Sequence, residues 1–192
     1  IAGDILWTVA SMLPQLLIPF GLTEKECGWI GFALTLSGAG LGWMVALYID
    51  RYRSYKKPLL VMLTVSATCF SGVILTLLYV DHKPSLYASC LILLTIMGSC
   101  LNALIPAQLE LGVELTYPVP EAISTAFLVC LSGMLSPLLT TGGTELIGNA
   151  PTRNTVIWFM VGCVLISVIS TLLILFVRDD EAVLNRLKIE RR

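Results

Sequence analysis

Charge is scarce in this sequence of 192 residues, where 12 Lys and Arg stand against 13 Asp and Glu and charged residues make up 13% of the chain. The chain is 56% hydrophobic, and its mean hydropathy is +0.86. The few charges gather in short gaps between long apolar runs, which excludes a nucleic-acid-binding surface and a disordered chain. This composition indicates that a lipid bilayer is the main solvent of the protein.

The sequence also lacks the residue patterns that enzymes and metal sites need. Its one histidine, His82, lies in a polar gap, and there is no CxxC pair or Cys/His cluster. No Walker loop, GxGxxG, HExxH or GxSxG motif occurs. Five of the six cysteines lie in or beside apolar runs, where thiols pack as small hydrophobes, and only Cys27 lies in a polar gap. We therefore predict no enzyme, no catalytic residue, no metal and no cofactor.

Six apolar segments occupy nearly the whole chain, and a spanning helix needs about 20 apolar residues. They run from Ile5 to Phe20, Gly28 to Ile49, Leu59 to Val80, Leu86 to Leu109, Ile123 to Ile147 and Val156 to Val177. All but the first are long enough to span. The first is short and carries Asp4, so we expect it to be the end of a longer helix. The prediction is an all-α membrane protein, with a six-helix bundle over 1–177 and a cytosolic tail over 178–192.

The basic residues divide unequally between alternate gaps. Three stand alone in the first, third and fifth gaps, and nine fill the second gap and the tail. Because Lys and Arg are retained on the cytoplasmic side, we expect both ends of the chain to be cytosolic. Six helices with both ends on one side are the size of one half of a twelve-helix transporter.

Two helices carry polar stripes at helical spacing. Asp4, Thr8, Ser11 and Gln15 share one face of the first segment, and Thr95, Ser99, Asn102 and Pro106 repeat that spacing in the fourth. Polar groups within a span are by default functional and face inward. We predict that Asp4, Gln15 and Asn102 face one aqueous cavity, and that Asp4 carries a proton. The alternatives are hydroxyls that join helices and, for Asp4, a solvated residue at a helix end.

Two further patterns concern contacts between helices. Gly38 and Gly42 form a GxxxG motif, which favours close helix packing over a hinge. A cytosolic charge network is expected where Asp50, Arg51 and Arg53, in the second gap, meet Glu110 and Glu114 at the end of the fourth segment. The matching stripes also predict two inverted three-helix repeats, residues 1 to 80 and 86 to 177.

Asp50-Arg51 and the basic turn after it resemble the inter-helix loop motif of the major facilitator superfamily. The stretch Glu110-x-x-x-Glu114-x-x-Tyr117-Pro118 followed by Glu121 resembles the solute carrier 49 family, which includes the feline leukaemia virus subgroup C receptors. Four short matches look most like its disrupted-in-renal-carcinoma branch: residues 28–32, 86–90, 101–102 and 117–121.

The resemblance implies that this chain is the carboxy-terminal half of a twelve-helix facilitator, which works with its amino-terminal six-helix half by alternating access. It implies cavity walls formed by the first and fourth helices and, for this branch, a lysosomal membrane and proton-linked uptake of vitamin B6 (pyridoxine). Choline, ethanolamine or haem transport at the plasma membrane is the alternative that the receptor branch implies. Gln15 matches a glutamine of that branch, but Gly133 stands where it has another. A receptor or scaffold that transports nothing is the remaining alternative.

Overall fold

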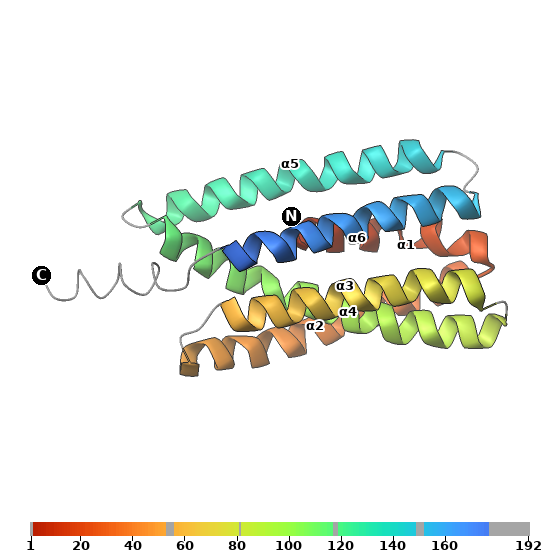
Figure 1. The fold of residues 1–192 in the computed structure, drawn as a ribbon, viewed down its shortest axis with the longest axis horizontal. Helices are drawn as coiled ribbons and strands as arrows, with labels where there is room; N and C mark the ends of the chain where they lie inside the picture. The colour runs from red at the N-terminus through yellow and green to blue at the C-terminus, as the bar shows by residue number, and fades with distance from the viewer. Residues whose placement is uncertain (1, 53–55, 81, 117–118, 149–151, 177–192) are drawn as a thin grey trace, which may run out of the picture.

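A computed structural model of the protein describes residues 2–52, 56–80, 82–116, 119–148 and 152–176, and within these ranges it is helical without a strand (Figure 1). The elements are α1 (Ala2–Leu17), the 3-10 helix η1 (Ile18–Phe20), α2 (Glu24–Tyr52), α3 (Lys56–Tyr79), α4 (Lys83–Leu115), α5 (Glu121–Ile147) and α6 (Arg153–Phe176). Six helical segments are long and apolar enough to cross a membrane. The all-α fold with six spans is therefore confirmed.

The first segment is longer than the sequence indicated. Because η1 continues the path of α1, the apolar stretch runs over Gly3–Phe20, which is 18 residues and sufficient for a span. Gly21 then ends η1 with a φ of 93°, a left-handed conformation that glycine adopts without strain. The prediction that this segment is too short to span was wrong, because we counted it only from Ile5.

The start of α2 is set by a capping box. The Thr23 backbone N–H and hydroxyl donate to Glu26 Oε2 at 2.7 and 2.8 Å, and the Glu26 N–H donates to Thr23 Oγ1 at 3.4 Å. This cap places Cys27 inside the first turn of α2, where its side chain is buried. The sequence had indicated a polar gap at Cys27, and the structure corrects that interpretation.

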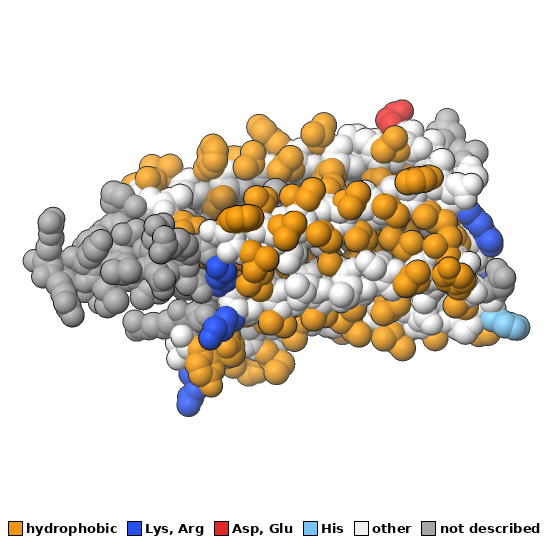
Figure 2. Space-filling view, viewed as in Figure 1, with side chains coloured by type: hydrophobic (Ala, Val, Ile, Leu, Met, Phe, Trp, Pro, Cys, Tyr) orange, Lys and Arg blue, Asp and Glu red, His pale blue; other side chains and the backbone are white. Residues whose placement is uncertain are grey.

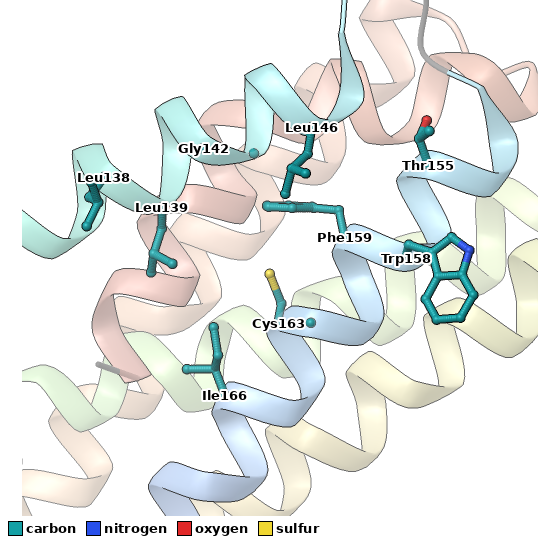
Figure 3. Close-up of a pocket in the computed structure, with 11 residues that line it drawn as sticks. Leu138, Leu139, Gly142, Leu146, Thr155, Trp158, Phe159, Cys163 and Ile166 are labelled. Atoms are coloured by element: carbon teal, nitrogen blue, oxygen red, sulfur yellow. The ribbon is translucent and has the colours of Figure 1, made fainter.

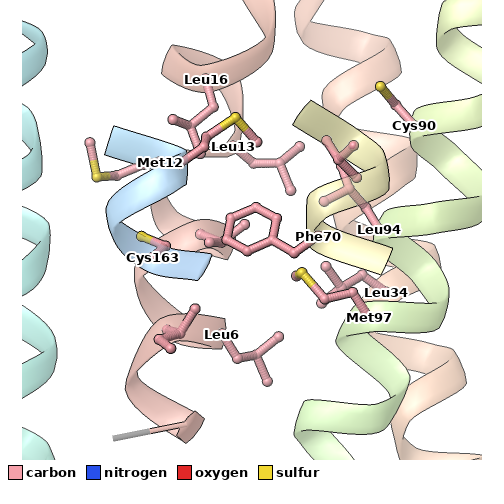
Figure 4. Packing of buried hydrophobic residues seen from close by; sticks show 14 of the residues in the cluster. Leu6, Met12, Leu13, Leu16, Leu34, Phe70, Cys90, Leu94, Met97 and Cys163 are labelled. Carbon is pink, nitrogen blue, oxygen red and sulfur yellow. The ribbon is translucent and has the colours of Figure 1, made fainter. Parts of the chain in front are cut away.

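The helices pack around a core that lies between α1, α3 and α4. Phe70 of α3 points into its centre, with Leu6, Leu13 and Leu16 of α1 on one side and Leu94 and Met97 of α4 on the other (Figure 4). These side chains are all buried, and removing them from an aqueous unfolded state is the main favourable contribution to folding. α1 is the most buried of the six spans and α5 the least.

The most extensive helix contact joins α2 and α4, and small residues lie within it. An added Cβ at Gly98 of α4 would lie 2.0 Å from Leu34 Cγ, and one at Gly42 of α2 would lie 3.7 Å from Ala103 Cα. Gly38 packs against Asn102, whose Cβ would lie 2.6 Å from an added methyl. The prediction that this GxxxG motif packs against another helix is confirmed, and α4 is the helix it contacts.

Most of the packed pairs have the symmetry that an inverted repeat predicts, and the exception is α5–α6, whose counterpart α2–α3 is not a packed pair among the described residues. In an inverted repeat, α1, α2 and α3 correspond to α4, α5 and α6. Under this exchange the α1–α5 contact corresponds to the α2–α4 contact, and the α3–α4 contact corresponds to the α1–α6 contact. The α4–α5 contact corresponds to the α1–α2 contact. The α1–α4 and α3–α6 contacts map onto themselves. α1 and α4 run in opposite directions along the bundle (Figure 1). This pattern supports two three-helix units related by an axis in the membrane plane.

The outer surface of the bundle suits a lipid environment. Hydrophobic side chains cover the middle of the face in view, and the described basic side chains and His82 lie near its two ends (Figure 2). Large apolar residues are highly exposed on α5 and α6, including Phe127 at 67% and Trp158 at 75%. In water, an apolar surface this extensive would promote aggregation, whereas in a bilayer it contacts hydrocarbon.

The α2–α4 contact yields a stability prediction. Gly98→Ala should lower the free energy of unfolding by about 1–3 kcal/mol, because its methyl group overlaps Leu34 at a packed helix crossing. The matched control is Gly40→Ala, at an exposed position of α2 with no atom within 4 Å. That change should stabilise the protein slightly or have no effect. Unfolding in detergent micelles measures both variants, and equal stabilities would contradict the packing.

Candidate functional site

The polar face of α1 is covered by α5 at its amino-terminal end. The Ser132 hydroxyl of α5 donates a hydrogen bond to Asp4 Oδ1, and Thr140 Oγ1 donates to Thr8 Oγ1 at 3.4 Å. Asp4 is 0% exposed and Thr8 is 1% exposed. The alternative that Asp4 is a solvated residue at a helix end is therefore wrong, because α5 packs directly over it.

The hydroxyls of α5 form a stripe that the sequence analysis missed. Ser132, Ser136 and Thr140 follow one another at intervals of four residues, so they share one face of the helix. Two of them contact the α1 stripe, as described above. The same periodicity that identified the stripes on α1 and α4 would have identified this one.

A cavity of about 640 Å³ opens beside Asp4, between the start of α1, the second half of α4 and the middle of α5. Its polar lining comes from Asp4, Gln108, Ser132 and Ser136, and its apolar lining includes Trp7. A cavity of this size accommodates a small organic molecule, and a few convergent polar groups in an apolar wall are typical of a ligand site. Gln108 was also missed, because it lies on a different face of α4 from Asn102.

The stripe on α4 contacts α2 instead of this cavity. The Ser99 hydroxyl lies 2.6 Å from Ser37 Oγ and 2.6 Å from its own helix's Thr95 carbonyl oxygen, and it is buried. Asn102 packs over Gly38 and does not line the cavity beside Asp4. These contacts favour the alternative interpretation, in which small polar side chains of α4 join two membrane helices and do not line a cavity.

The carboxy-terminal half of the α1 stripe is exposed. Ser11 and Gln15 lie on the same face as Asp4 but beyond the part that α5 covers. The Ser11 hydroxyl donates to the Thr8 carbonyl at 3.0 Å, and Gln15 does not line the Asp4 cavity. One stripe thus has a buried part and an exposed part, because α5 covers only its beginning.

Among the residues that the structure describes, no ion pair of the expected charge network forms. Asp50, Arg51 and Glu110 are exposed, and Arg51 and Glu110 form no ion pair with each other. Arg53 and the Glu114 side chain lie outside the described residues. Lys56 makes a contact that the sequence analysis missed: its Nζ donates to the Leu175 carbonyl at 3.1 Å, where a lysine satisfies the last turn of α6.

Within the described part of the chain, no three His, Cys, Asp or Glu side chains form a group that could hold a metal ion. The polar groups of the cavity are one carboxylate, one amide and two hydroxyls. These groups can bind a polar solute by hydrogen bonds or exchange a proton. A bundle of six apolar helices, three of which line such a cavity, is consistent with one half of a facilitator-type membrane protein.

The comparisons with known proteins identify the family. The chain is 32% identical over 132 residues to the solute carrier family 49 member 4 homolog of Xenopus laevis, a match that covers 67% of this chain and 28% of the relative. It is 29% identical over 134 residues to the homolog of Xenopus tropicalis, covering 68% of this chain and 29% of the relative. No family model matches the chain.

The chain belongs to the solute carrier 49 family. Its match spans less than a third of the length of these relatives, and it is a multi-pass membrane protein.

The contact between α1 and α5 generates a second prediction. Ser132→Ala should lower the free energy of unfolding by about 1–3 kcal/mol, because it removes a hydrogen bond to a buried carboxylate. Ser71→Ala is the matched control, since the half-buried Ser71 hydroxyl donates only within its own helix, to the Ala67 carbonyl at 2.9 Å. Unfolding in detergent compares the two variants. An effect of Ser132→Ala no larger than that of the control would contradict a stabilising Asp4–Ser132 bond.

Proposed function

We propose that this chain is the carboxy-terminal half of a secondary transporter, which moves a small polar organic solute by alternating access together with an amino-terminal six-helix half. The observation that carries the proposal is the cavity of about 640 Å³ whose lining residues include Asp4, an acidic residue that is 0% exposed. An ionisable group at such a depth is costly to bury and rare in helices that only pack. Membership of the solute carrier 49 family supports the same function.

The transport is proposed to be proton-coupled, with Asp4 as the proton-carrying group of this half. A carboxyl group can accept a hydrogen bond from Ser132 when ionised and donate one when protonated. Its partners therefore need not be lost when a proton is taken up. Pyridoxine is the first candidate substrate, because the motif resemblance is to the branch associated with vitamin B6 uptake.

The other predicted site residues have different proposed roles. They are Thr8, Ser11, Gln15, Ser99 and Asn102. Thr8 is held by α5, and Ser99 and Asn102 contact α2. Gln15 and Ser11 are exposed on α1, where they are proposed to contact solute or the other half of the transporter. Gln108, Ser132 and Ser136 join Asp4 as proposed solute contacts, because all three line its cavity.

The proposed orientation puts the α2–α3 and α4–α5 connections in the cytosol, together with the tail. The described ends of α2 and α4 and the starts of α3 and α5 lie at the same end of the bundle (Figure 1). Nine of the 12 Lys and Arg fall in the second gap and the tail. The membrane is proposed to be lysosomal.

An epitope tag placed after Arg192 of the full-length protein tests this topology. Antibody should reach the tag after digitonin opens only the plasma membrane, and the signal should coincide with a lysosomal membrane marker. A luminal epitope on a resident lysosomal protein is the control, because it stays protected under the same treatment. A tag that becomes accessible only after full permeabilisation would reverse the orientation, and a signal at the cell surface would reassign the membrane.

Solute uptake by the full-length protein in reconstituted vesicles tests the function. Pyridoxine uptake should increase with an inwardly directed proton gradient. Asp4→Asn should reduce uptake to the level measured without a gradient, because the amide cannot exchange a proton. The matched control is Glu145→Gln, which removes an exposed carboxyl group of α5 and should leave uptake unchanged.

The other outcomes of this experiment are equally informative. Gradient-dependent uptake that survives Asp4→Asn would assign proton coupling to the other half. Uptake of choline, ethanolamine or haem in place of pyridoxine would change the substrate. Binding without uptake of any of these solutes would favour a receptor or scaffold that transports nothing.

A further inference from the structure

α5 carries a proline inside its membrane-spanning part. Pro137 lies within the helix Glu121–Ile147, where each backbone N–H normally donates to the carbonyl four residues earlier. Proline has no N–H, so Pro137 cannot donate to the carbonyl of Gly133. α5 therefore contains a backbone acceptor that lacks its usual helical donor.

No side chain of the described residues supplies the missing donor to the Gly133 carbonyl. The hydroxyls of Thr140 and Thr141 each donate to a carbonyl four residues earlier, at 2.9 and 2.8 Å. The Ser132 hydroxyl donates to Asp4. Inside a membrane, a backbone carbonyl of this kind is tolerated where it is buried in protein or faces an aqueous cavity.

The Gly133 carbonyl lies on the wall of the cavity beside Asp4. Gly133 and Pro137 are both exposed and both line this cavity. Because glycine has no side chain, Gly133 contributes its backbone to the wall. A helical carbonyl points along the axis toward the residue four positions later, so the Gly133 oxygen lies between two residues that line the cavity.

The space in front of Gly133 is open. An added Cβ there would have no atom within 4 Å, whereas one at Gly143 of the same helix would lie 2.6 Å from Phe159. Gly133 does not have a positive φ, and glycine is unfavourable in a helix interior. Neither packing nor backbone conformation requires a glycine at position 133. Its effect is to leave the carbonyl accessible from the cavity.

The chemistry of this wall indicates what kind of solute group it binds. A carbonyl oxygen accepts and cannot donate, so it needs an O–H or N–H group of the solute. A cationic donor is stabilised best at the carboxyl group of Asp4, the one ionisable side chain that lines the cavity. A hydroxyl group is therefore the donor that suits the neutral Gly133 carbonyl.

We propose that the Gly133 carbonyl accepts a hydrogen bond from a hydroxyl group of the transported solute, while Asp4 binds a second donor of the same molecule. Asp4 is bonded to Ser132, the residue before Gly133, so one small molecule can reach both acceptors. The solute class is a small molecule with at least two hydrogen-bond donors, one of them a hydroxyl. This inference rests on the proposed function, because it requires a solute in the Asp4 cavity.

Equilibrium binding of pyridoxine, which has three hydroxyl groups, to the full-length protein in detergent tests the site without requiring transport. Pro137→Ala supplies a backbone N–H that can donate to the Gly133 carbonyl. It should weaken pyridoxine binding about fivefold, the loss expected for one neutral hydrogen bond. Pro14→Ala is the matched control, since Pro14 is an exposed proline inside α1 that does not line this cavity, and it should bind as the wild type does.

Three analogues, each lacking one hydroxyl group of pyridoxine, distinguish a direct contact from a change in helix shape. The analogue without the contacting hydroxyl should bind the wild type about fivefold more weakly than pyridoxine. It should lose no further affinity in Pro137→Ala, because the contact is already absent. A proline that acted only by bending α5 would weaken the binding of all four ligands equally, and that result would overturn the proposal.

A second variant acts on the same carbonyl from the glycine. Gly133→Leu covers the carbonyl and should weaken pyridoxine binding at least fivefold, also if Pro137→Ala is not monodisperse in detergent. Gly142→Leu is its control, since Gly142 is an exposed glycine of α5 with no atom within 4 Å and lies outside this cavity.

The outcomes separate this inference from the proposed function. Unchanged binding in Pro137→Ala and Gly133→Leu would overturn the inference, and gradient-dependent uptake in vesicles would then leave the proposed function standing. The expected binding pattern without any uptake would support the solute site and reject transport. Absence of pyridoxine binding by the wild type would overturn the inference for this class of solute.

Discussion

Inside hydrocarbon, a polar side chain finds no hydrogen-bond partner except another part of the protein. This constraint decides which helix faces meet in the bundle. Asp4 of α1 is covered by the hydroxyl stripe of α5, and Ser99 of α4 is covered by Ser37 of α2. Many other hydroxyls donate to a carbonyl three or four residues earlier in their own helix, as Thr64 does to Leu60 at 2.9 Å. The two stripes that cross between helices therefore define the two main polar contacts of the fold.

These two contacts differ in mechanical character. Between α2 and α4, glycines bring the backbones close together, and Leu34 and Asn102 fill the space that the missing side chains leave. A tightly interdigitated pair of this kind resists sliding. α5, in contrast, is the least buried span, and the described side-chain hydrogen bonds that join it to α1 are those of Ser132 and Thr140. α5 is thus the helix that can move with the smallest loss of packing, and it is also the one in contact with the buried carboxyl group.

The position of α5 gives its two sides different surroundings. One side borders the Asp4 cavity with hydroxyls, and the other borders a second cavity, between α5 and α6, with leucines and glycines (Figure 3).

The sequence alone determined five of the six spans, the absence of catalytic motifs, the small-residue contact of α2 and the polar face of α1, because each of these follows from composition or helical periodicity. Tertiary structure decided which neighbour covers each face. Periodicity puts Asp4 and Gln15 on one side of a helix, but only the crossing of α5 buries the first and leaves the second exposed. The equivalent stripe of α4 lies against α2 because Gly38 leaves room there for Asn102. A stripe specifies that a helix needs a polar partner, whereas the identity of that partner depends on close packing among all six helices.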